Sequence, residues 1–74
     1  MEFDQKKIDE AVLALLYLNA DKNYNTWKGF DWQSMNRLHD KGLITNPVSK
    51  AKSVYLTEEG FNKAKELFEK LFST

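Results

Sequence analysis

The sequence predicts a single α+β domain over residues 1–74, with three main helices and a two-stranded hairpin before the last helix. Three observations support this prediction. Residues 30–44 read as a short helix with a signal at each end, followed by an extended segment. Residues 53–56 alternate between apolar and polar side chains, as a strand does. The stretch that follows is amphipathic to the C-terminus, which is typical of a packed helix.

The first helix is expected from about Gln5 to Asn19, with Asp4 as its N-cap. Apolar residues at helical spacing predict the face that this helix turns toward the core. These residues are Ile8, Ala11, Val12, Leu15 and Leu18, with Leu16 and Tyr17 widening the stripe. A helix that is apolar over so much of its circumference packs on more than one side.

Residues 19–29 are the least regular part of the chain, and their Asn and Asp residues favour turns. Tyr24, Trp27 and Phe30 follow one another at intervals of three, so a single helical turn would point all three inward. Two interpretations remain open. The segment is either a loop held to the core by its aromatic side chains, or an aromatic-lined groove in which Trp27 is the anchor.

The second helix has Asp31 as its expected N-cap, and Phe30 and Met35 lie at the spacing of a hydrophobic staple. Gly42 is expected to end the helix in the left-handed conformation, with Leu43 folding back as in a Schellman motif. Because side chains three apart share a helix face, this helix should turn three large side chains toward the core. They are Trp32, Met35 and Leu38.

Two short strands are expected next, over residues 43–46 and 53–56, joined by a turn at Asn46-Pro47 and a polar tip over residues 48–52. Thr57 is the expected N-cap of the last helix, where Glu58 and Glu59 complement the helix dipole. Apolar side chains then continue at helical spacing to the C-terminus. They are Phe61, Ala64, Leu67, Phe68, Leu71 and Phe72.

Composition narrows the class of protein. The chain has no cysteine, which excludes disulfides and thiolate zinc sites and fits a reducing cytosol. The longest apolar run, residues 11–18, is far shorter than the ~20 residues that span a bilayer, and the N-terminal residues do not form a signal peptide. We therefore expect a cytoplasmic protein without membrane contact.

Residues 37–44 and residues 54–60, Val-Tyr-Leu-Thr-Glu-Glu-Gly, resemble the second half of a bacterial winged-helix domain. Regulators of the multiple-antibiotic-resistance and phenolic-acid types have a similar helix that ends in Gly-Leu-Ile. A wing hairpin follows, and a Leu-Thr-x-x-Gly segment then begins the next helix. The resemblance implies a winged-helix-like fold with residues 31–41 at the position of the recognition helix. The whole chain also resembles a small family of uncharacterised bacterial proteins, through residues 9–18, 27–32 and 56–60, and that resemblance implies no activity.

The resemblance and the charge distribution together favour double-stranded DNA as a partner. Residues 28–54 carry five cations and two acids, a net charge of +3, while the remainder of the neutral chain carries −3. A positive segment favours binding to a polyanion such as DNA. Asp31 and Asp40, however, flank the helix face that would contact the bases. The alternative is an ordinary solvated face. The expected DNA-binding residues are Gln33, Asn36, Arg37, Lys41, Lys50 and Lys52.

The second hypothesis is a protein-interaction module, either a homodimer or an adaptor, that does not bind DNA. Its basis is the neutral net charge, the short segment between the first helix and Asp31, and the many aromatic residues of so small a chain. The expected interaction residues are Tyr24, Trp27, Phe68, Leu71 and Phe72.

No catalytic residue, cofactor or metal site is expected, so the sequence predicts a protein that is not an enzyme. His39 is the single histidine and is placed to interact with the C-terminal end of a helix. Ser34, His39 and Asp40 point in different directions on a helix and do not form a triad. The three glycines stand apart and make no phosphate-binding loop.

Overall fold

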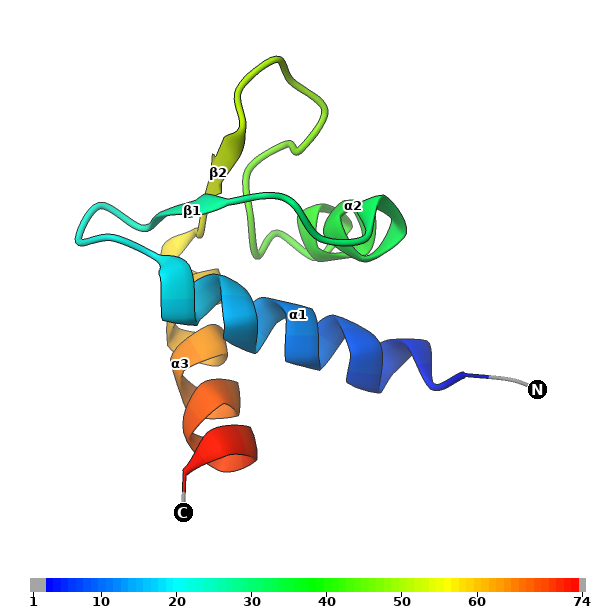
Figure 1. The fold of residues 1–74 in the computed structure, drawn as a ribbon, viewed down its shortest axis with the longest axis vertical. Coiled ribbons are helices and arrows are strands. Elements are labelled where there is room, and N and C mark those ends of the chain that lie inside the picture. The colour runs from blue at the N-terminus through cyan, green and yellow to red at the C-terminus, as the bar shows by residue number, and fades with distance from the viewer. Residues whose placement is uncertain (1–2, 74) are drawn as a thin grey trace.

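Three helices and a two-stranded antiparallel sheet make up the fold, which a computed structural model describes over residues 3–73 (Figure 1). In chain order the elements are α1 (Gln5–Asn19), β1 (Asn25–Trp27), α2 (Trp32–Asp40), β2 (Ser53–Tyr55) and α3 (Glu58–Phe72). The predicted α+β layout is confirmed. Met1, Glu2 and Thr74, at the two ends of the predicted domain, lie outside the described residues.

Each of the three helices begins after the N-cap that the sequence predicts. The side chains of Asp4, Asp31 and Thr57 each accept a hydrogen bond from the backbone N–H three residues later, at 3.1, 3.1 and 2.9 Å. These contacts satisfy backbone donors that have no partner inside the helix. The predicted start of α1 and its end at Asn19 are both confirmed.

The end of α2 is the predicted Schellman motif. Gly42 has a φ of +75°, in the left-handed region that glycine adopts without strain. Its N–H donates to the carbonyl of His39 at 2.9 Å, and the N–H of Leu43 donates to the carbonyl of Leu38 at 3.1 Å. The chain therefore leaves α2 in a fixed direction, toward the sheet.

The sheet pairs β1 with β2, so the expectation that residues 25–27 are a loop or a helical turn is wrong. Thr26 lies opposite Val54 in the register. The Thr26 hydroxyl is buried and donates to the carbonyl of Leu16 at 2.8 Å, which fixes β1 against α1. Pairing with β2 supplies backbone partners that a loop in this position would lack.

The hairpin expected before α3 is closed by a single antiparallel bridge between Ile44 and Leu56. Beside this bridge, the N–H of Thr45 donates to the carbonyl of Tyr55 at 2.9 Å. The first strand of the hairpin is thus reduced to one paired residue, and β1 supplies the longer partner of β2. We call residues 45–52, which connect α2 to β2, the wing loop.

The core lies where α1 packs against α2 and α3 (Figure 1). Met35 and Leu38 are buried as predicted. The apolar side chains with little or no exposure are Val12, Leu13, Ala14, Leu16, Met35, Leu38, Leu43, Ile44, Val54, Leu56, Ala64 and Leu67. The part of the chain that the structure describes contains no helix long and apolar enough to cross a membrane.

Several predicted core positions face solvent instead. Ile8 and Leu18, at the two ends of the predicted α1 stripe, are exposed, while Leu13, outside that stripe, is buried. Trp32 is exposed although it was expected beside Met35 and Leu38. The buried face of α1 is therefore rotated from the predicted one, and it includes the acidic residue Asp9.

Candidate interaction surface

A buried ion pair joins α1 to α2. The Nε of Arg37 donates to Oδ2 of Asp9 at 2.6 Å, and its Nη2 donates to Oδ1 at 2.8 Å. The same Nη2 donates to the hydroxyl of Ser34 at 3.2 Å. The Asp9 side chain is 4% exposed and the Arg37 side chain 31% exposed, so the carboxylate depends on its partner more than the guanidinium does.

This geometry fixes the charge of both groups. The hydrogen bonds from Arg37 lower the pKa of Asp9 below its usual value, against the opposing effect of burial, and Ser34 and Lys41 act in the same direction as Arg37. The bond to Asp9 raises the pKa of Arg37. Asp9 is thus a buried carboxylate that stays ionised, although it does not belong to the apolar face predicted for this helix.

The structure separates the six residues expected to bind DNA. Gln33, Lys41, Lys50 and Lys52 are exposed, and Asn36 is partly buried. Arg37, the third residue expected on the exposed face of α2, engages neighbouring side chains through its Nε and Nη2 atoms. Arg37 therefore holds α2 against α1.

Five apolar residues at and near the start of α2 are connected through Phe30, and we call them the tryptophan face: Trp27, Phe30, Trp32, Pro47 and Val48. Four of these residues line one open hollow of about 190 Å³, and the Trp27 ring lies 6.4 Å from the ring of Phe30, centroid to centroid. Trp27, Trp32 and Val48 are 59%, 68% and 76% exposed. Trp32 and Val48 line the hollow together, and exposed apolar side chains that gather in this way are typical of an interaction site.

The wing loop is tied to β1 beneath this face. The Nζ of Lys28 donates to the carbonyls of Pro47 and Ser49 at 2.6 and 2.9 Å. The backbone N–H of Lys28 donates to the carbonyl of Lys52 at 3.1 Å. These contacts hold Pro47 and Val48 against the residues that follow β1, so the two halves of the tryptophan face keep their relative positions.

Gly29 allows the Trp27 ring to lie flat along the backbone. A Cβ atom at position 29 would approach the Trp27 ring to 2.0 Å. The indole therefore occupies the space that any other residue at this position would fill. Trp27 is exposed on one side and supported on the other.

The five residues expected to form an interaction surface do not lie together. Trp27 belongs to the tryptophan face, whereas Leu71 and Phe72 are half-exposed in the last turn of α3. The C-terminal end of α3 points away from β1 and α2 (Figure 1). Phe68 and Tyr24 are partly buried against the core. The Tyr24 ring stacks on Phe61 at 4.2 Å, and this contact supports a tyrosine with a φ of +68°.

Sequence reasoning missed two members of the tryptophan face. Trp32 was assigned to the core, and Val48 to a polar tip. A pattern of exposed aromatic residues is not visible in a sequence, because the same residues at the same spacing also describe a buried face. Over residues 3–73, no group of three or more acidic, histidine or cysteine side chains is placed to hold a metal ion.

Comparison with known proteins gives two matches. The family described as a domain of unknown function (DUF6429) matches residues 4–74. An uncharacterized protein of Sinorhizobium fredii, y4hR, is 53% identical over 73 residues, which cover 99% of each chain. No solved structure matches significantly. The predicted resemblance of the whole chain to a family of uncharacterised proteins is therefore confirmed.

Proposed function

This chain belongs to the DUF6429 family, and from that premise we propose that it is a non-catalytic module that binds a partner protein through its tryptophan face. The observation that carries the proposal is the exposure of two indoles, Trp27 and Trp32, which are connected through Phe30: the Trp27 ring lies beside the Phe30 ring, and Phe30 and Trp32 line the same hollow. Tryptophan is the residue type most enriched among the side chains that dominate binding energy at protein interfaces. Exposing two of them costs solubility, and a partner that covers them offsets that cost.

The tryptophan face is prepared for binding. The Trp27 ring lies over Gly29 and next to Phe30, and the Lys28 ammonium holds the wing loop in position. A surface that is already ordered loses little conformational entropy when a partner covers it. A tryptophan side chain adds large contact area at the cost of only two rotatable bonds.

The charges around the face specify the chemistry of the partner. Lys50 and Lys52 are exposed on the same wing loop that supplies Pro47 and Val48. Residues 28–54 carry a net charge of +3. Electrostatic complementarity therefore favours a partner segment whose apolar side chains are flanked by acidic residues. We expect the apolar side chains in the hollow and the acids near the two lysines.

Affinity capture with matched variants tests this proposal. The full chain, immobilised at its C-terminus, is exposed to extract of its host beside Trp27→Ser/Trp32→Ser and, as a control, Leu71→Ser/Phe72→Ser. A partner of the tryptophan face should be retained by the wild type and the control but lost from the tryptophan variant. The purified partner should then bind the tryptophan variant at least tenfold more weakly in calorimetry.

Three results would contradict the proposal. The first is capture of the same proteins by the wild type and the tryptophan variant. The second is a captured partner whose contact segment contains no acidic residue. The third is a concentration-dependent dimer in analytical ultracentrifugation that the tryptophan variant abolishes, which would identify a second copy of the chain as the occupant. Circular dichroism should show equal helix content in all variants.

DNA binding is the second candidate function. It is favoured by the exposure of Gln33 and Lys41 on or next to α2 and of Lys50 and Lys52 on the wing loop. The order of helices, sheet and wing loop also agrees with a winged-helix-like arrangement, in which such residues approach a groove and its phosphates. The engagement of Arg37 with Asp9 weakens this candidate, because arginine is the most frequent reader of guanine.

Fluorescence anisotropy with a mixed-sequence duplex tests the DNA candidate. Binding by these residues should weaken steeply with added salt, and Lys50→Gln/Lys52→Gln should reduce the salt slope by about 2. Lys65→Gln/Lys70→Gln, on α3, is the matched control for lost charge. An absence of binding at low salt, or a slope that both variants reduce equally, would exclude this role for the wing loop.

A further inference from the structure

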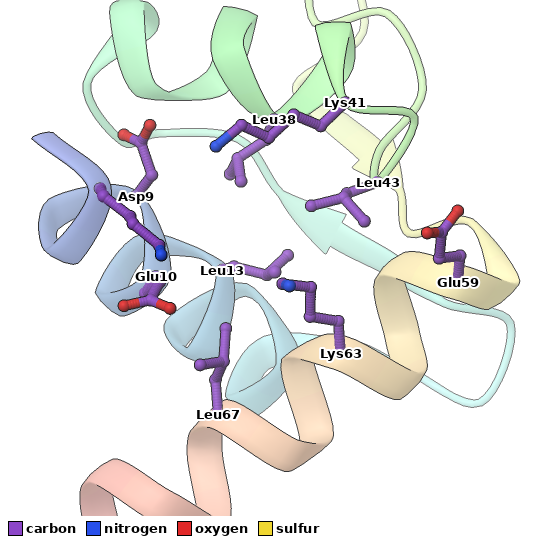
Figure 2. A pocket seen from close by; sticks show the side chains of 10 residues that line it. Asp9, Glu10, Leu13, Leu38, Lys41, Leu43, Glu59, Lys63 and Leu67 are labelled. Carbon is purple, nitrogen blue, oxygen red and sulfur yellow. The ribbon is translucent and has the colours of Figure 1, made fainter.

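A second cavity lies on another part of the surface, where all three helices meet (Figure 2). Its volume is about 170 Å³. Four of its ten lining residues are leucines: Leu13 of α1, Leu38 of α2, Leu67 of α3, and Leu43, which follows Gly42. These leucines are almost completely buried and form the apolar floor of the cavity. The other lining residues are charged, and Lys6, Lys41, Glu59 and Lys63 among them are exposed.

Lysines surround this apolar floor. Lys63 reaches from α3 across the cavity toward Leu13, and Lys41 reaches from the end of α2 in the direction of Asp9 (Figure 2). Lys6 contributes a third ammonium group to the lining. Among residues 3–73, the one ion pair within 4 Å is that of Arg37 with Asp9, so these three lysines have no such partner in the described chain.

The acidic residues of the lining do not neutralise these lysines at the centre of the cavity. Both oxygens of Asp9 accept hydrogen bonds from Arg37. In Figure 2 the carboxylates of Glu10 and Glu59 lie at opposite edges of the cavity, away from the Lys63 ammonium. With Asp9 already paired, the remaining lining carries three cations and two acids, an excess of one positive charge.

We propose that this cavity binds a small aliphatic monocarboxylate, with its carboxylate between Lys41 and Lys63 and its tail on the four leucines. A single negative charge matches the local excess, and charge-assisted hydrogen bonds to ammonium groups are the strongest that this lining offers. The cavity is smaller than the ~300–1,000 Å³ of sites for drug-sized ligands, so the tail must be short. A ligand of this size binds with a dissociation constant on the order of a millimolar.

Titration of the ¹⁵N-labelled full chain with hexanoate, followed by NMR, tests this inference. Hexanoate should shift the backbone amides around the four leucines saturably, and hexanol and hexylamine, which share its tail, should bind at least tenfold more weakly. Lys63→Gln and Lys41→Gln should each weaken hexanoate about tenfold. Lys65→Gln, an exposed α3 lysine outside the lining, should leave the dissociation constant unchanged.

Saturable binding of hexanol or hexylamine as tight as that of hexanoate would overturn the inference, and so would the absence of saturable shifts. An equal effect of Lys65→Gln and Lys63→Gln would also overturn it, since that result indicates diffuse attraction by the surface. The test is independent of the partner proposed for the tryptophan face. Trp27→Ser/Trp32→Ser should bind hexanoate like the wild type, so failure of either proposal can be recognised separately.

Discussion

The ion pair between Asp9 and Arg37 makes a quantitative prediction for the variant Asp9→Asn. The amide keeps the size of the carboxylate but lacks its charge and one of its two acceptor oxygens. The wild type has two charge-assisted hydrogen bonds at 2.6 and 2.8 Å, of which the variant keeps at most one, in a weaker form. The side-chain NH₂ also becomes a donor at a site where the residue is only 3% exposed.

These losses set the expected magnitude. A hydrogen bond to a charged group contributes about 1.5–3 kcal/mol when it is buried. Water replaces part of this loss, because the Arg37 side chain is about one-third exposed. We expect Asp9→Asn to lower the free energy of unfolding by about 1–2 kcal/mol. For a chain of 74 residues this corresponds to a decrease in Tm of roughly 5–15 °C.

The effect should depend on pH with a defined sign. The pKa of Asp9 is lower in the folded protein than in the unfolded chain, where it is about 3.9. The stability that the ionised carboxylate contributes is therefore fully present above the unfolded pKa and is lost as the pH falls through the folded one. The difference between the wild type and Asp9→Asn should stay constant from about pH 7 to about pH 5 and shrink as the pH falls below about 4.

Urea unfolding followed by far-UV circular dichroism measures this difference. The helical signal is the better probe, because Trp27 and Trp32 are already exposed in the folded state and their emission changes little on unfolding. Asp40→Asn, at an exposed acid of α2, is the matched control and should change stability by less than about 0.5 kcal/mol. A loss for Asp9→Asn no greater than that of the control, or one that does not vary with pH, would refute the reasoning.

Three further predictions concern Thr57 and the three glycines, and urea unfolding measures the first two. Thr57→Ala should lower the free energy of unfolding by about 1–2 kcal/mol. The Thr57 hydroxyl accepts a hydrogen bond from the N–H of Gly60 at 2.9 Å and donates one to the carbonyl of Gly42 at 2.8 Å, and alanine loses both. Thr57→Ser keeps the hydroxyl and should retain most of this stability. Gly60→Ala should lower the free energy of unfolding by about 3 kcal/mol or more, since its Cβ would lie 1.8 Å from a backbone carbonyl oxygen. Gly42→Ala has open space around its Cβ, so it should lose only the ~1–2 kcal/mol that a left-handed φ costs a residue other than glycine. An equal loss in the two glycine variants would contradict this order. Gly29→Ala should displace the Trp27 ring and so change the near-UV circular dichroism spectrum. It should lower the free energy of unfolding by less than about 1 kcal/mol. An unchanged spectrum would show that the ring does not rest on the glycine.

The helices could be predicted from the sequence because their ends are specified locally. A cap side chain and the N–H that it satisfies lie three residues apart, so the residues that decide where a helix begins are adjacent in the chain. The same holds for the glycine that ends α2. Asp4, Asp31, Thr57 and Gly42 were all assigned correctly for this reason.

Strand β1 could not be predicted in the same way. Its three residues have as partners a strand more than twenty-five residues later and, through the Thr26 hydroxyl, a carbonyl of α1. Nothing within residues 25–27 specifies either partner. The turn before β1 is local, since the carboxylate of Asp21 accepts from the N–H groups of Asn23 and Asn25 at 2.8 and 3.1 Å. That signal indicated a turn correctly but gave no information on the strand that follows.

The candidate site was predicted only in part, and the reason lies in how α2 is rotated about its axis. Successive residues of a helix are about 100° apart, so Trp32, Met35 and Leu38 span roughly 120° and make a plausible core face. The structure buries Ser34 in place of Trp32, on the other side of Leu38. Ser34 has a small side chain, and its hydroxyl accepts from the guanidinium that also binds the α1 carboxylate. This polar contact turns α2 toward α1, and the same rotation carries Trp32 out to solvent. The ion pair that holds Arg37 against α1 is thus what supplies the tryptophan face with its second indole.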